Sequence, residues 1–141
     1  MEEIRHAAGI AQIGDFIDGL EDGYHTRVAQ GGNNFSGGQK QRLAIARALV
    51  KKPEIYIFDD SFSALDFKTD ARLRAALKEE TTHSAVILVA QRISTIMDAD
   101  QIVVLDEGRV AGIGTHKELM ESCEVYREIS QSQMGGGIDE A

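Results

Sequence analysis

The sequence has little of several features that would identify particular classes of protein. It contains one cysteine, Cys123, which excludes an internal disulfide and most cysteine-based metal sites. No apolar run approaches the roughly 20 residues that a membrane-spanning helix needs, because the most apolar stretches, 85–90 and 102–105, have the length of strands. The first residues are acidic where a secretory signal would be basic. We therefore expect a chain in the style of cytosolic proteins.

Basic residues are also in the minority. The 141 residues include 15 Lys and Arg against 23 Asp and Glu, and the formal net charge is −8. Non-specific binding to nucleic acid depends on basic surfaces, so this composition argues against a nucleic-acid partner. The length is that of one small domain with a core of its own.

A polar stretch that opens a helix is the most informative part of the chain. Ser36 is a good helix N-cap, and Gly37 and Gly38 follow it. Because these glycines lack side chains, the amide groups of the first helical turn can approach an anion closely. The stretch therefore predicts a phosphate-binding helix N-terminus.

The helix that follows, through Lys51, is predicted to be amphipathic. Leu43, Ala46 and Val50 share one face, and Pro53 ends the helix. The basic side chains are expected to keep the rest of the helix partly solvated; they are Lys40, Arg42, Arg47 and Lys51.

A short apolar run comes next and ends in two carboxylates. Residues 55–58 are too few for a helix and too apolar for an edge strand, so we expect a buried parallel strand. Its carboxyl end presents Asp59 and Asp60. In open α/β sheets ligands bind at that end of the strands.

In this order the motifs resemble those of ABC-type ATPases. Phe35-Ser36-Gly37-Gly38-Gln39 is similar to the signature motif Leu-Ser-Gly-Gly-Gln, residues 55–60 resemble the Walker B strand, and Ser-Ala-Leu-Asp at 63–66 matches the D-loop. Upstream, residues 26–32 resemble the X-loop of exporter-type cassettes, although Gln30 replaces the usual glutamate.

The resemblance implies an α/β fold. We expect a partial P-loop NTPase of the ABC-cassette type, with a helical lobe that carries the signature and an incomplete, mostly parallel sheet. Residues 1–52 would form the helical subdomain with the X-loop and signature motif. Residues 53–131 would form the C-terminal part of the ATPase core, and 132–141 a disordered tail, with disorder expected from Ser130 onward because of three consecutive glycines.

Local patterns predict the remaining elements. They are short helices over 2–11 and 15–20, a loop over 19–34, a crossover helix over 71–80, a buried strand over 85–90, a short helix over 93–97, a hairpin of strands 101–105 and 109–113 that turns at Asp106-Glu107-Gly108, and a helix opened by a capping box of Thr115 and Glu118.

The resemblance also implies ATP and Mg²⁺ as cofactors and gives roles to individual residues. Asp59 would orient Mg²⁺, Asp60 stands in the place of the catalytic glutamate, and Gln91 stands in the place of the switch histidine. In dimers of the family, the signature and D-loop serve the ATP of the partner subunit. The residues in that role are Ser36, Gly37, Gly38, Gln39 and Asp66.

The two departures, Asp60 and Gln91, fall in the chain's own nucleotide site. We therefore predict one half of a heterodimeric exporter whose own site is degenerate; the alternative is tolerated drift in a homodimer. The implied partners are a second ABC nucleotide-binding domain and the membrane domains of an exporter. The implied location is the cytoplasmic face of the cell membrane.

No Gly-Lys-Ser or Gly-Lys-Thr phosphate loop occurs in the sequence. We therefore expect the chain to cover the C-terminal part of a cassette, to be inactive alone as an ATPase, and to be marginally stable because a strand edge lacks its neighbour. A second hypothesis is a non-catalytic interaction module that binds or regulates another cassette through its signature motif. A soluble, non-transport ABC protein is disfavoured by the acidic charge and the X-loop.

Overall fold

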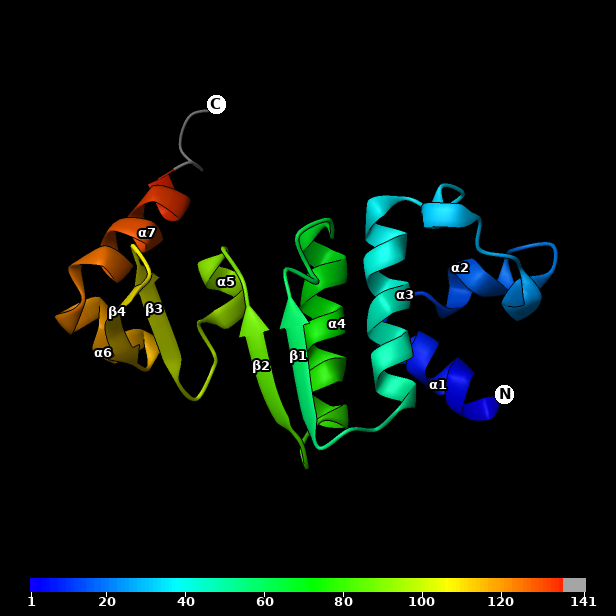
Figure 1. Ribbon diagram of the computed structural model, residues 1–141, viewed down its shortest axis with the longest axis horizontal. Helices are drawn as coiled ribbons and strands as arrows, with labels where there is room; N and C mark the ends of the chain where they lie inside the picture. Colours follow the sequence, from blue (N-terminus) through cyan, green and yellow to red (C-terminus); the bar gives the residue numbers. More distant parts are fainter. Residues whose placement is uncertain (136–141) are drawn as a thin grey trace. The chain divides into compact units, whose positions relative to one another are not determined.

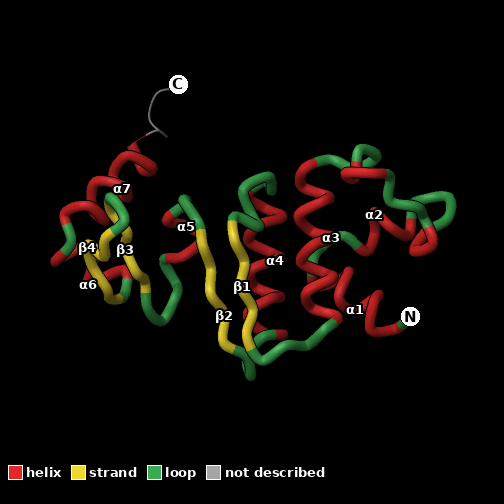
Figure 2. The backbone as a smooth tube through the Cα atoms, in the orientation of Figure 1, coloured by secondary structure: helices red, strands yellow, loops and turns green. Residues whose placement is uncertain are grey.

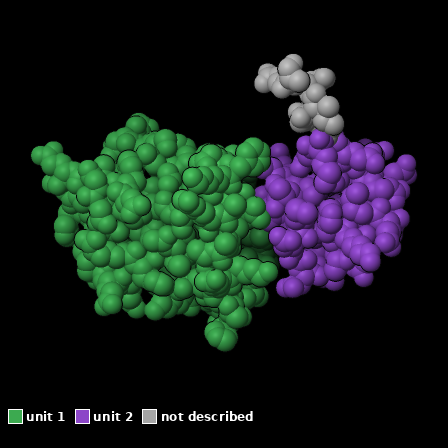
Figure 3. Space-filling model, turned by 180° about the vertical axis from the view of Figure 1, so that it is seen from behind, with its two compact units in different colours: residues 1–89 green, residues 90–141 purple. Residues whose placement is uncertain are grey.

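The computed structural model describes residues 1–135, which form two compact units. Unit 1 is Met1–Val89, and unit 2 begins at Ala90 (Figure 3). Each unit has its own cluster of buried apolar side chains. Among residues 1–135, every helix is too short or too polar to cross a membrane.

Unit 1 begins with helices and then alternates strand and helix (Figures 1 and 2). Its elements are α1 (Glu2–Ile10), α2 (Gly14–Asp18), the 3-10 turns η1 (Gly23–His25) and η2 (Gln30–Gly32), α3 (Gly37–Val50), β1 (Ile55–Asp59), α4 (Phe67–Glu80) and β2 (Ala85–Val89). The two short helices, the signature helix and the crossover helix are therefore confirmed. β1 and β2 pair in parallel, as the crossover through α4 requires.

Helix α3 ends as its sequence predicts, and it buries more side chains than the predicted face contains. Lys52 has a positive φ of 47° and donates its N–H to Leu49 O at 3.0 Å, and Pro53 follows. The most buried side chains of α3 are Ile45, Ala46 and Leu49. Of the predicted face, Ala46 is buried, whereas Leu43 and Val50 are only partly buried against the core. The predicted face therefore does pack against the core, and the structure adds Ile45 and Leu49 as its most buried members.

The two parallel strands are buried on one face only. Tyr56 and Phe58 of β1 belong to the core of unit 1. On the other face Ile57 is 68% exposed, and its neighbour Ile87 on β2 is 51% exposed. The prediction of fully buried strands was therefore wrong for this face, because the described residues of unit 1 supply a covering layer on the Tyr56 side alone.

Unit 2 contains a hairpin packed against helices. Its elements are α5 (Ile93–Ile96), β3 (Ile102–Asp106), β4 (Arg109–Gly114), α6 (His116–Ser122) and α7 (Glu124–Gly135). The predicted tight turn is confirmed: Glu107 and Gly108 both have positive φ, 46° and 75°, as a two-residue type I′ turn requires. The capping box of Thr115 and Glu118 is also confirmed at the start of α6.

Helix α7 extends into the region predicted to be a tail. Tyr126 and Ser130, one helical turn apart, are each 1% exposed, and the helix continues to Gly135. The prediction of disorder from Ser130 was therefore wrong over 130–135, because Ser130 is buried and the side chain of Gln133 bonds to the backbone of Gln91 and Ile93. Residues 136–141 of the predicted tail lie outside the described residues. The functional division into 1–52, 53–131 and 132–141 stays a prediction.

Candidate functional site

A complete capping box starts the signature helix. Gln39 N donates to Ser36 Oγ at 3.2 Å, and Ser36 N donates to Gln39 Oε1 at 2.9 Å. The first intrahelical backbone bond runs from Lys40 N to Ser36 O at 2.9 Å. The amides of Gly37 and Gly38 therefore belong to the turn whose N–H groups face beyond the helix end, where an anion is favoured.

The signature glycines lie directly against the D-loop. A Cβ placed on Gly38 would lie 2.9 Å from the backbone oxygen of Ala64, and one placed on Gly37 would lie 3.6 Å from Ala64 Cβ. Only glycine allows this approach at position 38 without a shift of the backbone. The two motifs, which are 24 or more residues apart in the sequence, form one surface at the amino end of α3.

The two carboxylates at the end of β1 are both exposed. Asp60 has a positive φ of 50°, which aspartate tolerates better than most residues. Its N–H donates to Val89 O at 2.9 Å, so the residue after β1 is still held against β2. The left-handed backbone then turns the chain away from the strand direction and into the loop that reaches α3.

Asp66, the last residue of the D-loop, caps helix α4. Its Oδ1 accepts from Thr69 N at 2.9 Å, and its Oδ2 accepts from Thr69 Oγ1 at 2.7 Å. The side-chain and backbone hydrogen bonds of Thr69 hold the pKa of Asp66 below its ordinary value. The D-loop therefore ends in a fixed carboxylate that is ionised at neutral pH.

Gln41 and Arg42 belong to the site, although sequence reasoning did not identify either as functional. Gln41 Nε2 donates to Asp60 O and to Ser63 Oγ, each at 3.0 Å. Arg42, expected only to be partly solvated, is half-buried and donates from Nη1 to Gln12 O at 2.5 Å. These partners lie 19 or more residues away in the sequence. A single sequence contains no signal that would pair them.

Gln91 lies in unit 2 and is exposed. Its carbonyl oxygen accepts from Gln133 Nε2 at 2.6 Å, while Gln133 Oε1 accepts from Ile93 N at 2.8 Å. Gln133 thus fixes the backbone on both sides of the start of α5. The structure brings the signature glycines against Ala64 of the D-loop. It places Gln91 in the other unit, where α7 holds its backbone.

The residues of unit 1 fit the chemistry of a nucleotide with Mg²⁺. Mg²⁺ in such sites is held by one or two carboxylates and by substrate phosphates, and Asp59 offers such a carboxylate. Within residues 1–135, no group of three or more His, Cys, Asp or Glu could form a metal cage. The helix N-terminus beside Gly37 and Gly38 provides the amide donors that a phosphate requires.

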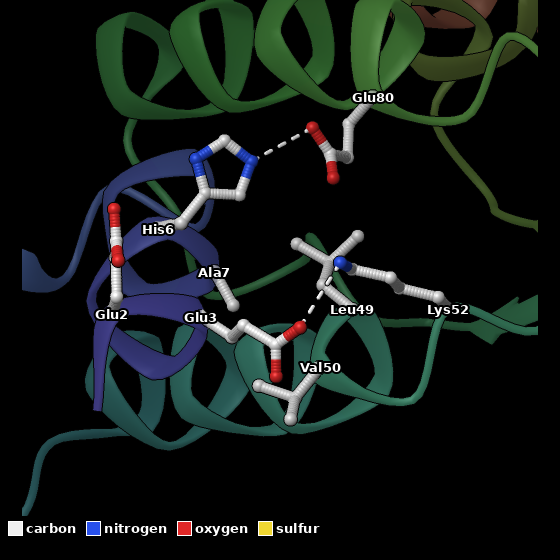
Figure 4. Close-up of a pocket in the computed structure, with 8 residues that line it drawn as sticks. All are labelled: Glu2, Glu3, His6, Ala7, Leu49, Val50, Lys52 and Glu80. Carbon is white, nitrogen blue, oxygen red and sulfur yellow. Dashed lines mark hydrogen bonds and ion pairs between the residues drawn. The ribbon is translucent and has the colours of Figure 1, made fainter.

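A cavity of about 240 Å³ lies at the other end of α3, between α1, α3 and α4 (Figure 4). Across it, His6 Nε2 contacts Glu80 Oε2 at 2.9 Å, and Lys52 Nζ contacts Glu3 Oε1 at 3.3 Å. The floor is apolar, with Leu49 among its lining residues. The first pair joins α1 to α4, and the second joins α1 to the segment after α3. Neither pair contains a predicted site residue.

The comparisons with known proteins agree with this geometry. Residues 7–63 match the family model described as ABC transporter. An uncharacterized ABC transporter ATP-binding protein of Mycobacterium tuberculosis is 49% identical over 132 residues, which are 94% of this chain and 22% of that protein. A similar protein of Bacillus subtilis is 47% identical over 135 residues, which are 96% of this chain and 23% of that protein.

The fold comparison agrees with the sequence comparisons. The structure of a bacterial Atm1-family ABC exporter with ATP bound matches with a TM-score of 0.91 and 44% identity, over 94% of this chain and 24% of that chain. These matches confirm an ABC transporter ATP-binding domain. The predicted partial ABC-cassette fold is confirmed as well. The chain spans 22% to 24% of the length of these relatives.

Proposed function

We propose that the chain serves in an ATP-binding and ATP-hydrolysing subunit of an ABC-type membrane exporter. One observation carries the proposal: the amino end of α3 packs on the D-loop through Gly38, and the same loop begins at the carboxylates where β1 ends. Amide donors for phosphate and carboxylates for Mg²⁺ therefore belong to one end of unit 1. The 44% identity to an Atm1-family exporter supports the exporter type.

The signature end of α3 would serve the ATP of a partner domain. Its amides would hold phosphate oxygens, and the charge of the phosphates would be favoured by the helix N-terminus. The D-loop would approach the same nucleotide through Asp66, whose side chain is fixed by Thr69. The residues in this role are Ser36, Gly37, Gly38, Gln39 and Asp66.

The carboxylates after β1 would serve the nucleotide of this subunit. Asp59 would hold Mg²⁺, which supplies charge neutralisation of the phosphates when bound. Asp60 would accept a proton from the attacking water, but its side chain is shorter than that of glutamate by one bond of about 1.5 Å. Gln91 would donate a hydrogen bond to phosphate without the positive charge that a histidine can supply. Hydrolysis in this site would therefore be slow.

A slow site in this subunit, together with an intact signature for the partner's site, favours a heterodimer. The partner would be a second ABC nucleotide-binding domain, and both domains would act on the membrane domains of an exporter. That assembly places the chain at the cytoplasmic face of the cell membrane. Residues 1–52 would act as the signature-bearing lobe, and residues 53–131 would act as part of the ATPase core.

The signature role is tested by substitutions that keep the helix cap. Ser36→Asp retains a side-chain acceptor for Gln39 N, because aspartate caps helices as well as serine does, but it adds a negative charge where a phosphate would bind. Ser36→Thr is the matched control with a neutral hydroxyl. The probe is the isolated ATP-binding domain of the Atm1-family exporter, with Mg²⁺ and a non-hydrolysable ATP analogue.

We expect nucleotide-dependent binding of the probe to this chain, measured by isothermal calorimetry. Ser36→Asp should weaken that binding by about tenfold or more, because one charge near a surface phosphate is worth about 1–4 kcal/mol. Ser36→Thr should bind as the wild type does. Equal binding by Ser36→Asp and the wild type, with circular dichroism showing both folded, would refute the role of the signature.

The slow-site part of the proposal has its own test in a complete complex. Restoring Asp60→Glu together with Gln91→His should raise the ATPase rate, because both substitutions supply the groups that the family uses. No gain in rate would contradict the degenerate site and favour drift in a homodimer.

A second candidate is a non-catalytic module that regulates another cassette through its signature. The signature residues themselves support this candidate, because the amides beside Gly37 and Gly38 would bind a nucleotide that is held by another domain. Under this hypothesis, adding the chain to the probe domain with hydrolysable ATP should lower the ATPase rate of the probe. Under the exporter proposal, the rate should rise, because the chain completes the probe's site.

A further inference from the structure

The side chain of Gln41 makes three hydrogen bonds to one loop. Its Nε2 donates to Asp60 O and to Ser63 Oγ, each at 3.0 Å, and its Oε1 accepts from Ala64 N at 2.9 Å. Gln41 lies on α3 one turn beyond the signature glycines. Both polar atoms of one amide are therefore committed to the loop over residues 60–64.

A residue that holds this loop in place would position two of its backbone groups, at Asp60 and at Ala64. Asp60 has a left-handed backbone, so its carbonyl direction depends on what holds the peptide in place. Ala64 contributes the backbone oxygen that would lie 2.9 Å from a Cβ at position 38. The same peptide segment therefore connects the residue in the place of the catalytic base with the signature glycines.

We propose that Gln41 is a positioning residue that couples the two nucleotide sites of the transporter. By clamping residues 60–64 to α3, it makes the signature helix and the Asp60 backbone move as one body. When the partner's ATP binds at Gly37 and Gly38, the position of the Asp60 backbone then changes as well, in the site of this subunit. The coupling rests on the proposed function, which assigns the two nucleotide sites. The clamp of Gln41 on residues 60–64 does not depend on that function.

The clamp is tested by amide hydrogen exchange in the full chain, followed by NMR. Gln41→Met keeps the size and helix preference of the side chain and removes its hydrogen bonds. Gln41→Glu keeps an acceptor for Ala64 N and loses the donor to Asp60 O. The matched control is Gln131→Met, on the exposed surface of α7.

We expect Gln41→Met to speed exchange of the Ala64 amide by about five- to tenfold, the equivalent of one hydrogen bond. Gln41→Glu should leave that amide protected, and the control should change nothing. The amide of Thr81, which donates to Leu77 O at the end of α4 and lies outside the clamped loop, serves as an internal reference. Equal exchange of the Ala64 amide in the wild type and Gln41→Met would overturn the clamp.

The coupling is tested by adding the Atm1-family ATP-binding domain with Mg²⁺ and the ATP analogue. In the wild type, protection should appear at Gly37 and Gly38 and also at Ala64. In Gln41→Met it should appear at the glycines alone. A general loss of stability in Gln41→Met would lower protection at the glycines and at Ala64 alike.

The outcomes separate this inference from the proposed function. If the wild type gains protection at Gly37 and Gly38 but none at Ala64, the coupling is overturned and the proposed function stands. If the probe protects neither region, the proposed function and the coupling both fail, and the clamp is judged by the exchange measured without the probe.

Discussion

Gly38→Ala is the substitution that most directly tests the packing of the signature on the D-loop. In an open helical position, replacing glycine by alanine stabilises a helix by about 1 kcal/mol. At Gly38 the added Cβ would lie 2.9 Å from the backbone oxygen of Ala64, which is 0.5 Å inside the 3.4 Å where ordinary contact begins. Overpacking of this kind costs about 1–3 kcal/mol. We therefore expect a net destabilisation of about 1 kcal/mol.

Two other glycines in helices provide matched controls. A Cβ on Gly37 meets Ala64 Cβ at 3.6 Å, an ordinary contact, and a Cβ on Gly9 of α1 meets nothing within 4 Å. We expect Gly37→Ala to be close to neutral and Gly9→Ala to stabilise the chain by about 0.5–1 kcal/mol. The assay is urea titration followed by circular dichroism, with an osmolyte present so that the folded state is well populated.

The order of the three urea midpoints tests whether Gly38 is packed tightly on the D-loop. The packing described above requires Gly9→Ala to be the most stable and Gly38→Ala the least. A Gly38→Ala variant at least as stable as Gly37→Ala would show that the D-loop backbone can move away from the added Cβ at little cost. The close contact would then not require glycine at position 38.

Three further predictions follow from other parts of the chain. Replacing Ile57 and Ile87 together by threonine should reduce self-association in light scattering with less than about 1 kcal/mol of lost stability, since both side chains are more than half exposed; a larger loss would mean that the face is covered. Thr115→Ala should cost about 1 kcal/mol in urea titration through loss of the α6 cap, and an unchanged midpoint would contradict that role. Because the hydrogen bonds of Thr69 lower the pKa of Asp66, the α4 cap contributes stability above the unfolded pKa of Asp66 and loses it as the pH falls through the folded pKa. Asp66→Asn, which caps without titrating, should flatten the acid side of the plot of stability against pH. An unchanged acid side in this variant would exclude Asp66 as the source of that pH dependence.

The features that sequence reasoning predicted correctly are those governed by neighbours in the chain. The cap of α3 depends on Ser36, the cap of α6 on Thr115 and Glu118, and the hairpin turn on Glu107 and Gly108. In each case the hydrogen bonds or dihedral angles involve residues within about four positions. Such chemistry is visible in a single sequence because the partners are adjacent in it.

The errors concern burial, which depends on what lies across the fold. An apolar run such as 55–58 indicates a strand but does not reveal whether one face or both are covered, and Ile57 is exposed here. The glycines after Met134 suggested a tail, yet Tyr126 and Ser130 are buried and α7 continues to Gly135. Both judgements required knowledge of the facing element, which no local pattern contains.

Gln41 shows why the site itself was only half predictable. The motifs identified the residues with obvious chemistry, such as Asp59, Asp60 and the signature glycines, because carboxylates and glycines have few other reasons to occur in that order. A glutamine on a helix has many ordinary reasons to be there, and its three hydrogen bonds are made to a loop 19 to 23 residues later. The close approach of Gly38 to Ala64 brings that loop within reach of the amide, so the role of Gln41 follows from the packing of the glycine and becomes visible only when the fold is known.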